Sequence, residues 1–130
     1  MILSQKNGRN YAIMVSQKNK AKKKGQNIMA LIKVTKENFE EIKASEKPVL
    51  IDFYADWCGP CRMVAPIVGK IADEHPEYVI GKVNVDEEGE LAREFGVMSI
   101  PTLVVLKDGE IANKAIGSKN EAQILQLLNV

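Results

Sequence analysis

The only two cysteines of this 130-residue chain, Cys58 and Cys61, stand three positions apart where an apolar run gives way to a helical pattern. Within one helical turn this spacing puts both sulfurs on the same side, with α-carbons close enough to be bridged without backbone movement. A disulfide across so short a loop restricts the unfolded chain very little, so it contributes little to stability. A bond of this kind, easily made and broken, indicates redox chemistry.

Other uses of a Cys-x-x-Cys pair are poorly supported by the rest of the sequence. A structural zinc ion needs four ligands, and the chain offers two Cys and one His, His75. An iron–sulfur cluster needs more thiolates than exist here. Attachment of a c-type haem needs His directly after Cys61, where Arg62 stands. A purely structural bridge is typical of small secreted proteins with many cysteines. We therefore expect no metal and no cofactor other than the redox disulfide itself.

Cys58 is expected to be the attacking residue of the pair. It precedes the helical pattern, and unpaired backbone donors and the helix dipole at a helix N-terminus stabilise a thiolate. The pKa of this thiol should therefore fall below its reference of about 8.5. Attack of Cys58 on a substrate disulfide gives a mixed disulfide, which Cys61 then resolves.

Charge is distributed unevenly along the chain. Residues 1–28 hold seven basic side chains and no acidic one, whereas the remainder holds 11 basic and 17 acidic residues. The basic stretch has no secretory signal pattern, and we expect it to be a disordered extension. A basic arm for nucleic acid or anionic membrane and a transit peptide are the alternatives. Because no apolar run approaches the roughly 18 residues of a membrane span, we expect a soluble protein without a membrane partner. We also expect a cytoplasmic monomer without a nucleic-acid partner.

Met29 opens the folded pattern and is expected to be the physiological start. Just upstream, Lys22-Lys23-Lys24-Gly25 must be encoded by AAR-AAR-AAR-GGN, and three codons separate this purine-rich stretch from Met29. Such a stretch resembles a bacterial ribosome-binding site read as protein. The sequence thus predicts an extension at 1–28 and one folded domain at 29–130.

Hydrophobic periodicity and turn residues predict the element order β-α-β-α-β-α-β-β-α. Nearly continuous apolar residues at 48–55 and 79–85 are typical of strands covered on both faces, and a shorter strand is expected at 31–34. Strands at 102–106 and 111–116 flank Asp108-Gly109, which is a hairpin turn signal. Parallel βαβ units followed by an antiparallel hairpin imply an α/β fold, in which a mixed five-stranded sheet has helices on both faces.

Four helices are expected between and after these strands. Thr35 is predicted to cap a helix of about ten residues. A longer helix should begin at Gly59 with one apolar face. Asp86 should cap a short helix that Gly96 ends. The last helix should open with the capping-box pattern Ser118-Lys119-Asn120-Glu121.

The residues around the cysteine pair resemble the thioredoxin family. The resemblance rests on Phe-Tyr-Ala-Asp-Trp-Cys-Gly-Pro-Cys-Arg at 53–62, on Pro66 and on Ser-Ile-Pro-Thr at 99–102, and it extends from about Leu31 to Leu128. It implies a thioredoxin fold and a protein disulfide reductase that a thioredoxin reductase recharges and that serves client proteins with disulfides. Two positions depart from the family pattern, since Tyr54 stands where Trp is common and Ser99 where Gly is also frequent.

The resemblance also implies roles for residues outside the pair. Asp52 matches a buried Asp that helps to deprotonate the resolving cysteine, and Lys82 matches a lysine near that Asp. Pro101 is expected to be cis and to face the cysteines, while Pro60 suggests a reductant, because oxidising relatives are associated with His there. A contact surface for clients is expected at Trp57, Gly59, Pro60, Ile100 and Gly117.

Each of these assignments has a simpler alternative. Asp52 could be a strand-edge residue facing water, Lys82 an ordinary surface lysine and Trp57 a core aromatic residue. The whole fold could serve as a non-catalytic binding subunit of another complex, although an intact cysteine pair argues against that use.

Overall fold

The computed structural model describes residues 30–130, and the expected extension at 1–28 and the expected start at Met29 lie outside them. The described elements follow the predicted order, so the predicted α/β architecture is confirmed. They are β1 (Leu31–Lys33), α2 (Phe39–Lys43), β2 (Val49–Tyr54), α3 (Gly59–Glu74), β3 (Val79–Asn84), α4 (Gly89–Glu94), β4 (Thr102–Lys107), β5 (Glu110–Ile116) and α5 (Glu121–Leu127).

The five strands form one mixed sheet in the order β1-β3-β2-β4-β5. β3 pairs in parallel with both β1 and β2, whereas β4 pairs antiparallel with β2 and with β5. β2 and β3 are central strands, and five of the six residues of β2 are buried, as their apolar composition predicts.

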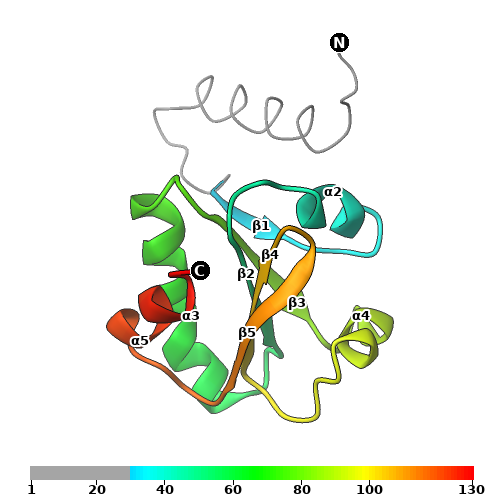
Figure 1. Ribbon diagram of the computed structural model, residues 1–130. Coiled ribbons are helices and arrows are strands. Elements are labelled where there is room, and N and C mark those ends of the chain that lie inside the picture. The colour runs from blue at the N-terminus through cyan, green and yellow to red at the C-terminus, as the bar shows by residue number, and fades with distance from the viewer. Residues whose placement is uncertain (1–29) are drawn as a thin grey trace.

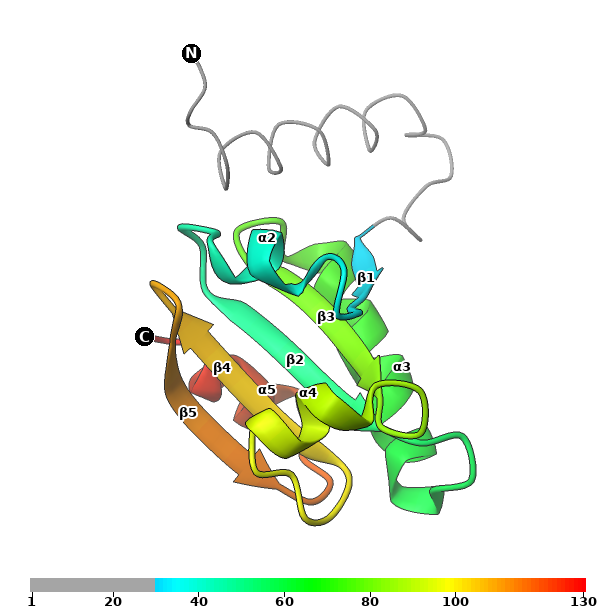
Figure 2. The ribbon, with the colours of Figure 1, turned by 90° about the vertical axis from the view of Figure 1, so that its right-hand side faces the viewer.

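Helices cover both faces of the sheet (Figures 1 and 2). Because side chains alternate along a strand, successive residues of β2 enter different hydrophobic clusters. Val49, Ile51 and Phe53 join residues of α2 and α4 on one face. Leu50 joins residues of α3 and α5 on the other. Asp52 and Tyr54 share the face of Leu50 and therefore project toward the α3 side of the sheet.

The β4–β5 hairpin turns where the sequence predicts it. Asp108 and Gly109 have φ angles of 55° and 83°, so both central residues of the turn occupy the left-handed region. This backbone is the type I′ conformation, whose twist matches that of the two strands and which Asp-Gly adopts readily.

Three predicted helix starts were wrong by a few residues. α2 begins at Phe39 instead of after Thr35, because Asn38 Oδ1 accepts a 2.8 Å hydrogen bond from the Thr35 N–H and closes a turn ahead of the helix. The residue that precedes α4 is Glu88, not Asp86. The capping box of α5 lies two residues later than expected, between Asn120 and Gln123.

No helix among residues 30–130 is long and apolar enough to cross a membrane.

Candidate redox site

The two cysteines form a disulfide at the N-terminus of α3. Cys58 is the N-cap residue and Cys61 lies in the first turn, with their α-carbons 5.3 Å apart. Only 5% of Cys58 and 2% of Cys61 is exposed. The amphipathic pattern of α3 positions the pair, because Val64, Val68 and Ile71 bury one face of the helix against the sheet and place Cys61 on that same inner face.

A backbone N–H of the helix points at the sulfur of Cys58. The backbone N–H of Cys61 donates a 3.2 Å hydrogen bond to Cys58 Sγ, so a sulfur occupies the position at which an N-cap side chain accepts. The dipole of α3 adds a positive partial charge at the same point. This arrangement favours negative charge on Cys58 once the disulfide is reduced.

The loop before β4 and the loop after β5 both lie beside the start of α3. The Ile100–Pro101 peptide bond is cis, as predicted, and the Ile100 carbonyl oxygen lies 3.9 Å from Cys58 Sγ. The Gly117 N–H donates a 2.8 Å hydrogen bond to the Pro101 carbonyl. The structure thus brings Ile100, Pro101 and Gly117 together beside the disulfide.

Packing at the end of α4 holds the loop that leads to Pro101. The Phe95 ring contacts Phe39 edge-on at a centroid distance of 5.6 Å and Phe53 at 5.3 Å. Lys114 of β5 donates a 2.8 Å hydrogen bond to the Phe95 carbonyl oxygen. Aromatic packing and this hydrogen bond fix the loop to the sheet, so that Ile100 keeps its place beside the cysteines.

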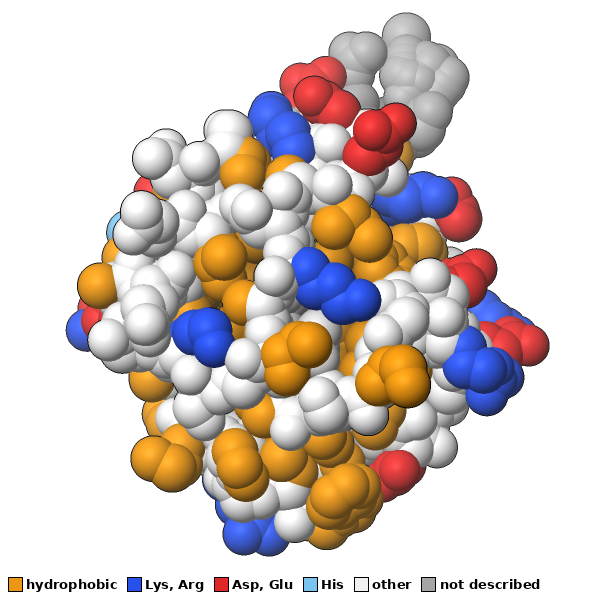
Figure 3. Space-filling model, turned by 60° about the horizontal axis from the view of Figure 1, so that its bottom comes forward, with side chains coloured by type: hydrophobic (Ala, Val, Ile, Leu, Met, Phe, Trp, Pro, Cys, Tyr) orange, Lys and Arg blue, Asp and Glu red, His pale blue; other side chains and the backbone are white. Residues whose placement is uncertain are grey.

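Exposed apolar side chains surround the buried disulfide. Trp57 is 68% exposed and Met98 is 92% exposed, while Gly59 and Pro60 are also exposed and Ile100 and Gly117 are half-buried. Figure 3, in which the bottom of Figure 1 comes forward, shows hydrophobic side chains gathered on this face with a few Lys or Arg side chains among them. Trp57 is therefore a surface residue, and its alternative reading as a core aromatic residue is wrong.

Asp52 is buried in the sheet, with 3% of its surface exposed. Its Oδ1 atom has no hydrogen-bond partner among the described residues. Burial raises the pKa of Asp52 to about 7, and the charge of Lys82 acts in the opposite direction. The alternative reading of Asp52 as an edge residue facing water is therefore wrong.

Lys82 lies directly across from Asp52 in the parallel register of β2 and β3, so both side chains project from the same face. Lys82 is half-buried, in contrast to an ordinary surface lysine. The described structure thus places a carboxyl group with a raised pKa and a cation on the sheet face that α3 covers.

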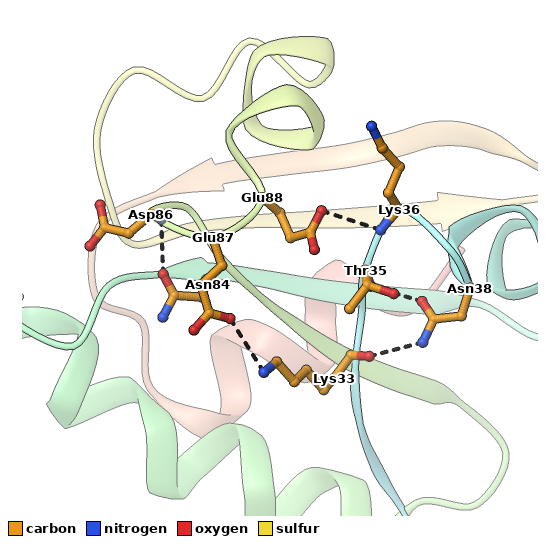
Figure 4. A network of polar contacts seen from close by, with 8 residues as sticks. All are labelled: Lys33, Thr35, Lys36, Asn38, Asn84, Asp86, Glu87 and Glu88. Carbon is orange, nitrogen blue, oxygen red and sulfur yellow. Dashed lines mark hydrogen bonds and ion pairs between the residues drawn. The ribbon is translucent and has the colours of Figure 1, made fainter.

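Asp86 takes part in the site in a way that the sequence analysis did not predict. It follows β3 and accepts a 2.9 Å hydrogen bond at Oδ2 from Trp57 Nε1. Its own N–H donates to Asn84 Oδ1 at 2.8 Å (Figure 4). A signal was available, because residues that follow adjacent parallel strands meet at the same edge of a sheet. The acidic residue after β3 was therefore a candidate neighbour of the motif after β2.

Within residues 30–130, one group of potential metal ligands lies at the opposite end of α3. Glu74, His75 and Glu121 offer ligand atoms within 4.8 Å of one another. Glu121 is paired with Lys70 at 2.9 Å, and His75 Nδ1 is 2.9 Å from Glu77 Oε2. These contacts make the group an ion-pair cluster at the surface, and we assign no metal to it.

Comparison with known proteins agrees with this geometry. The sequence model of the family described as Thioredoxin matches residues 30–130. A thioredoxin of Mycobacterium bovis is 46% identical over 102 residues, covering 77% of this chain and 88% of that protein. A bifunctional thioredoxin reductase/thioredoxin of Mycobacterium leprae is 44% identical over 92 residues, which are 70% of this chain and 20% of that protein.

Solved structures of thioredoxins also match the fold. The solved structure of a mutant thioredoxin from Halobacterium salinarum superposes with a TM-score of 0.71 and 35% sequence identity, and it covers 75% of this chain and 87% of that one. Similarity on this scale, in sequence and in fold, runs through the segments that hold the disulfide. The chain belongs to the thioredoxin family of protein-disulfide oxidoreductases.

Proposed function

We propose that the chain reduces disulfides of client proteins, with Cys58 as the attacking residue and Cys61 as the resolving residue. The observation that carries this assignment is the hydrogen bond from the Cys61 N–H to Cys58 Sγ at the start of α3. The thiolate of reduced Cys58 attacks one client sulfur, the client S–S bond breaks, and the second client sulfur leaves as a thiolate that takes up a proton. A mixed disulfide between Cys58 and the client remains.

Asp52 then acts as the proton acceptor for Cys61. The Cys61 thiol transfers its proton to the Asp52 carboxylate, and the new thiolate attacks Cys58 Sγ. The Cys58–Cys61 disulfide forms, and the first client sulfur leaves as a thiolate that takes up the proton released by Asp52, directly or through water, so that Asp52 is again a carboxylate. The client has then gained two electrons and two protons. A carboxyl with a pKa near 7 is suited to this transfer because it exchanges a proton readily at neutral pH.

The remaining residues orient the groups that react. Lys82 sets the electrostatic environment of Asp52 from the neighbouring strand. Pro101 and the Ile100 carbonyl lie beside the sulfurs, where an extended client segment can pair with the backbone. Trp57, Gly59, Pro60 and Gly117 complete an apolar contact surface around the disulfide.

Electrons come from a thioredoxin reductase. The fused reductase of the Mycobacterium leprae relative supports this partner, since the two activities occur there in one protein. Pro60 between the cysteines suggests a reductant and not an oxidant. A reductant works in a compartment that keeps thiols reduced, and we therefore propose the cytoplasm. No bound cofactor beyond the cysteine pair is required for the exchange itself.

Reduction of insulin disulfides in the presence of a thioredoxin reductase and NADPH tests this function. The wild-type chain should catalyse many turnovers without any added metal or cofactor on the chain. Cys58→Ser should lose the activity because no thiolate remains to attack. Unchanged insulin reduction by Cys58→Ser, or absence of activity in the reductase-coupled wild-type protein, would favour the alternative of a non-catalytic binding subunit.

A further inference from the structure

Tyr54, which no step above uses, lies beside both Asp52 and Lys82. It follows Asp52 by two residues in β2, so the two side chains share one face of the sheet. The Lys82 Nζ atom lies over the Tyr54 ring, 5.6 Å from its centroid. This distance is within the range of about 6 Å in which an ammonium group is attracted by an aromatic face.

Lys82 does not bond to the carboxyl group that stands opposite it. Asp52 Oδ1 lacks a hydrogen-bond partner, and Lys82 forms no ion pair with Asp52 among the described residues. A lysine has a long, flexible stem, and a buried unpaired carboxyl oxygen is a strong acceptor for it. The Lys82 ammonium lies instead over the Tyr54 ring, which is the group that it contacts.

The surrounding charges leave Lys82 as the cation that acts on Asp52. Lys33 of β1 is the register partner of Lys82 on the other side, but it pairs with Glu87 at 3.3 Å (Figure 4). On β4, Asp52 faces the apolar Leu103. The buried side chains of α3 carry no charge, and Asp56, which acts on Tyr54, is exposed at the end of the strand.

We propose that Tyr54 is a positioning residue, whose ring face holds the Lys82 ammonium near Asp52 but out of a direct ion pair with it. An effect of Tyr54 on the redox reaction depends on the proposed role of Asp52 as proton acceptor. The position of the Lys82 ammonium over the ring does not depend on that role. The side chain at this position thereby sets how strongly Lys82 stabilises the Asp52 carboxylate. The conservative variant Tyr54→Phe keeps the ring face and should preserve the arrangement, while Tyr54→Leu removes it.

NMR titration of the Asp52 carboxyl carbon in the oxidised protein tests the proposal, because the disulfide form has no thiol that titrates with it. In Tyr54→Leu the freed ammonium should reach Oδ1, so that the pKa of Asp52 falls by about 1 pH unit. In Tyr54→Phe the pKa should match that of the wild type. In the Lys82→Met background, Tyr54→Leu should leave the pKa of Asp52 unchanged.

Two results of this titration would overturn the proposal. If Tyr54→Leu changes the pKa of Asp52 equally in the wild-type and Lys82→Met backgrounds, Tyr54 acts by covering Asp52 from water and not through Lys82. A rise in the pKa of Asp52 in Tyr54→Leu would mean that the ring draws Lys82 toward Asp52 instead of holding it away.

A second measurement uses only the wild-type protein and Tyr54→Phe, so it still applies if Tyr54→Leu does not fold. The ε-methylene protons of Lys82 should show an upfield ring-current shift that Tyr54→Phe retains. Absence of this shift in the wild type would also overturn the positioning.

The pH profile of the resolving step tests the proposed role of Asp52 separately from the positioning by Tyr54. If Asp52 accepts the Cys61 proton, the pH profile of the resolving step should move with the pKa of Asp52 in Tyr54→Leu. A changed pKa with an unchanged pH profile would remove the proposed role of Asp52 and leave the positioning by Tyr54 intact.

Discussion

Asp52 is the residue whose chemistry depends most on its surroundings. A carboxylate without a hydrogen-bond partner is costly inside a sheet, so burial raises the pKa of Asp52 from 3.8 to about 7. Between these two pH values the native state holds a proton that the unfolded chain has lost. The free energy of unfolding therefore falls as the pH rises through this window, by about 1.4 kcal/mol per pH unit for this one group.

Asp52→Ala should stabilise the fold at pH 8 by about 1–3 kcal/mol, because the charge penalty removed exceeds the packing lost. At pH 4 the wild-type carboxyl is neutral in the native state, so the gain should be small. Urea unfolding of both proteins at the two pH values measures the difference. A loss of stability at pH 8, or the same gain at both pH values, would show that an unpaired charge is not the cause.

The position of some residues in the fold could be predicted from the sequence, whereas the side-chain contacts of others could not. The helix-start position of Cys58 followed from local spacing alone, and the structure bears it out. The contacts of Trp57 with Asp86 and of Lys82 with Tyr54 join different strands or the loops after them. The sequence could place Asp86 at the same sheet edge as Trp57, but the contacts themselves depend on the register of β2 and β3, which one sequence does not specify.

At the scale of elements, strands were easier to predict than helix starts. Continuous apolar runs and the Asp108-Gly109 turn act locally, and the central strands and the hairpin lie where these signals predict. Helix starts depend on which of several nearby polar side chains accepts a backbone hydrogen bond. Asn120 accepts the Gln123 N–H and caps α5 in place of Ser118, whereas Asn38 makes no cap hydrogen bond to α2 and instead closes a turn ahead of it.

Gly81 lies where β1 and β3 approach so closely that a larger side chain would clash. A β-carbon at this position would lie 2.5 Å from Val34 Cγ2 and 3.3 Å from the Ile32 carbonyl oxygen. Val34 is buried and cannot yield freely, so Gly81→Ala should destabilise the fold by about 1–3 kcal/mol.

Gly69 provides a matched control within α3, because a β-carbon there would meet no atom within 4 Å. Gly69→Ala should be neutral or should stabilise the helix by up to about 1 kcal/mol. Urea unfolding of the two variants measures both effects. Equal stability of Gly81→Ala and Gly69→Ala would contradict the described packing of β1 on β3.

Charge in the whole molecule is divided between an acidic part at 29–130 and a basic N-terminal stretch. Residues 29–130 carry 11 basic and 17 acidic side chains, and residues 1–28 carry seven basic ones. The match to the family begins at residue 30, so the basic stretch lies outside the part shared with relatives.

Truncation to Met29 should leave the melting temperature and the rate of insulin reduction essentially unchanged, because the match to the family and the disulfide both lie within residues 30–130. Thermal unfolding and the reductase-coupled assay check this, and N-terminal sequencing of protein from its native source should find Met29 or Ala30 first. Protein that starts near Met1, or a clear loss of activity on truncation, would make the stretch a functional part of the molecule. Salt-sensitive binding to an acidic partner would then be the expected role.

Trapping the mixed disulfide distinguishes the attacking cysteine, Cys58, from the resolving cysteine, Cys61. The Cys61→Ser protein should form a covalent complex with a disulfide-containing client such as insulin, since the bond made by Cys58 is no longer resolved. Mass spectrometry should locate that bond at Cys58, and Cys58→Ser should capture far less. Capture by Cys58→Ser and none by Cys61→Ser would show that Cys61 attacks the client and Cys58 resolves the mixed disulfide.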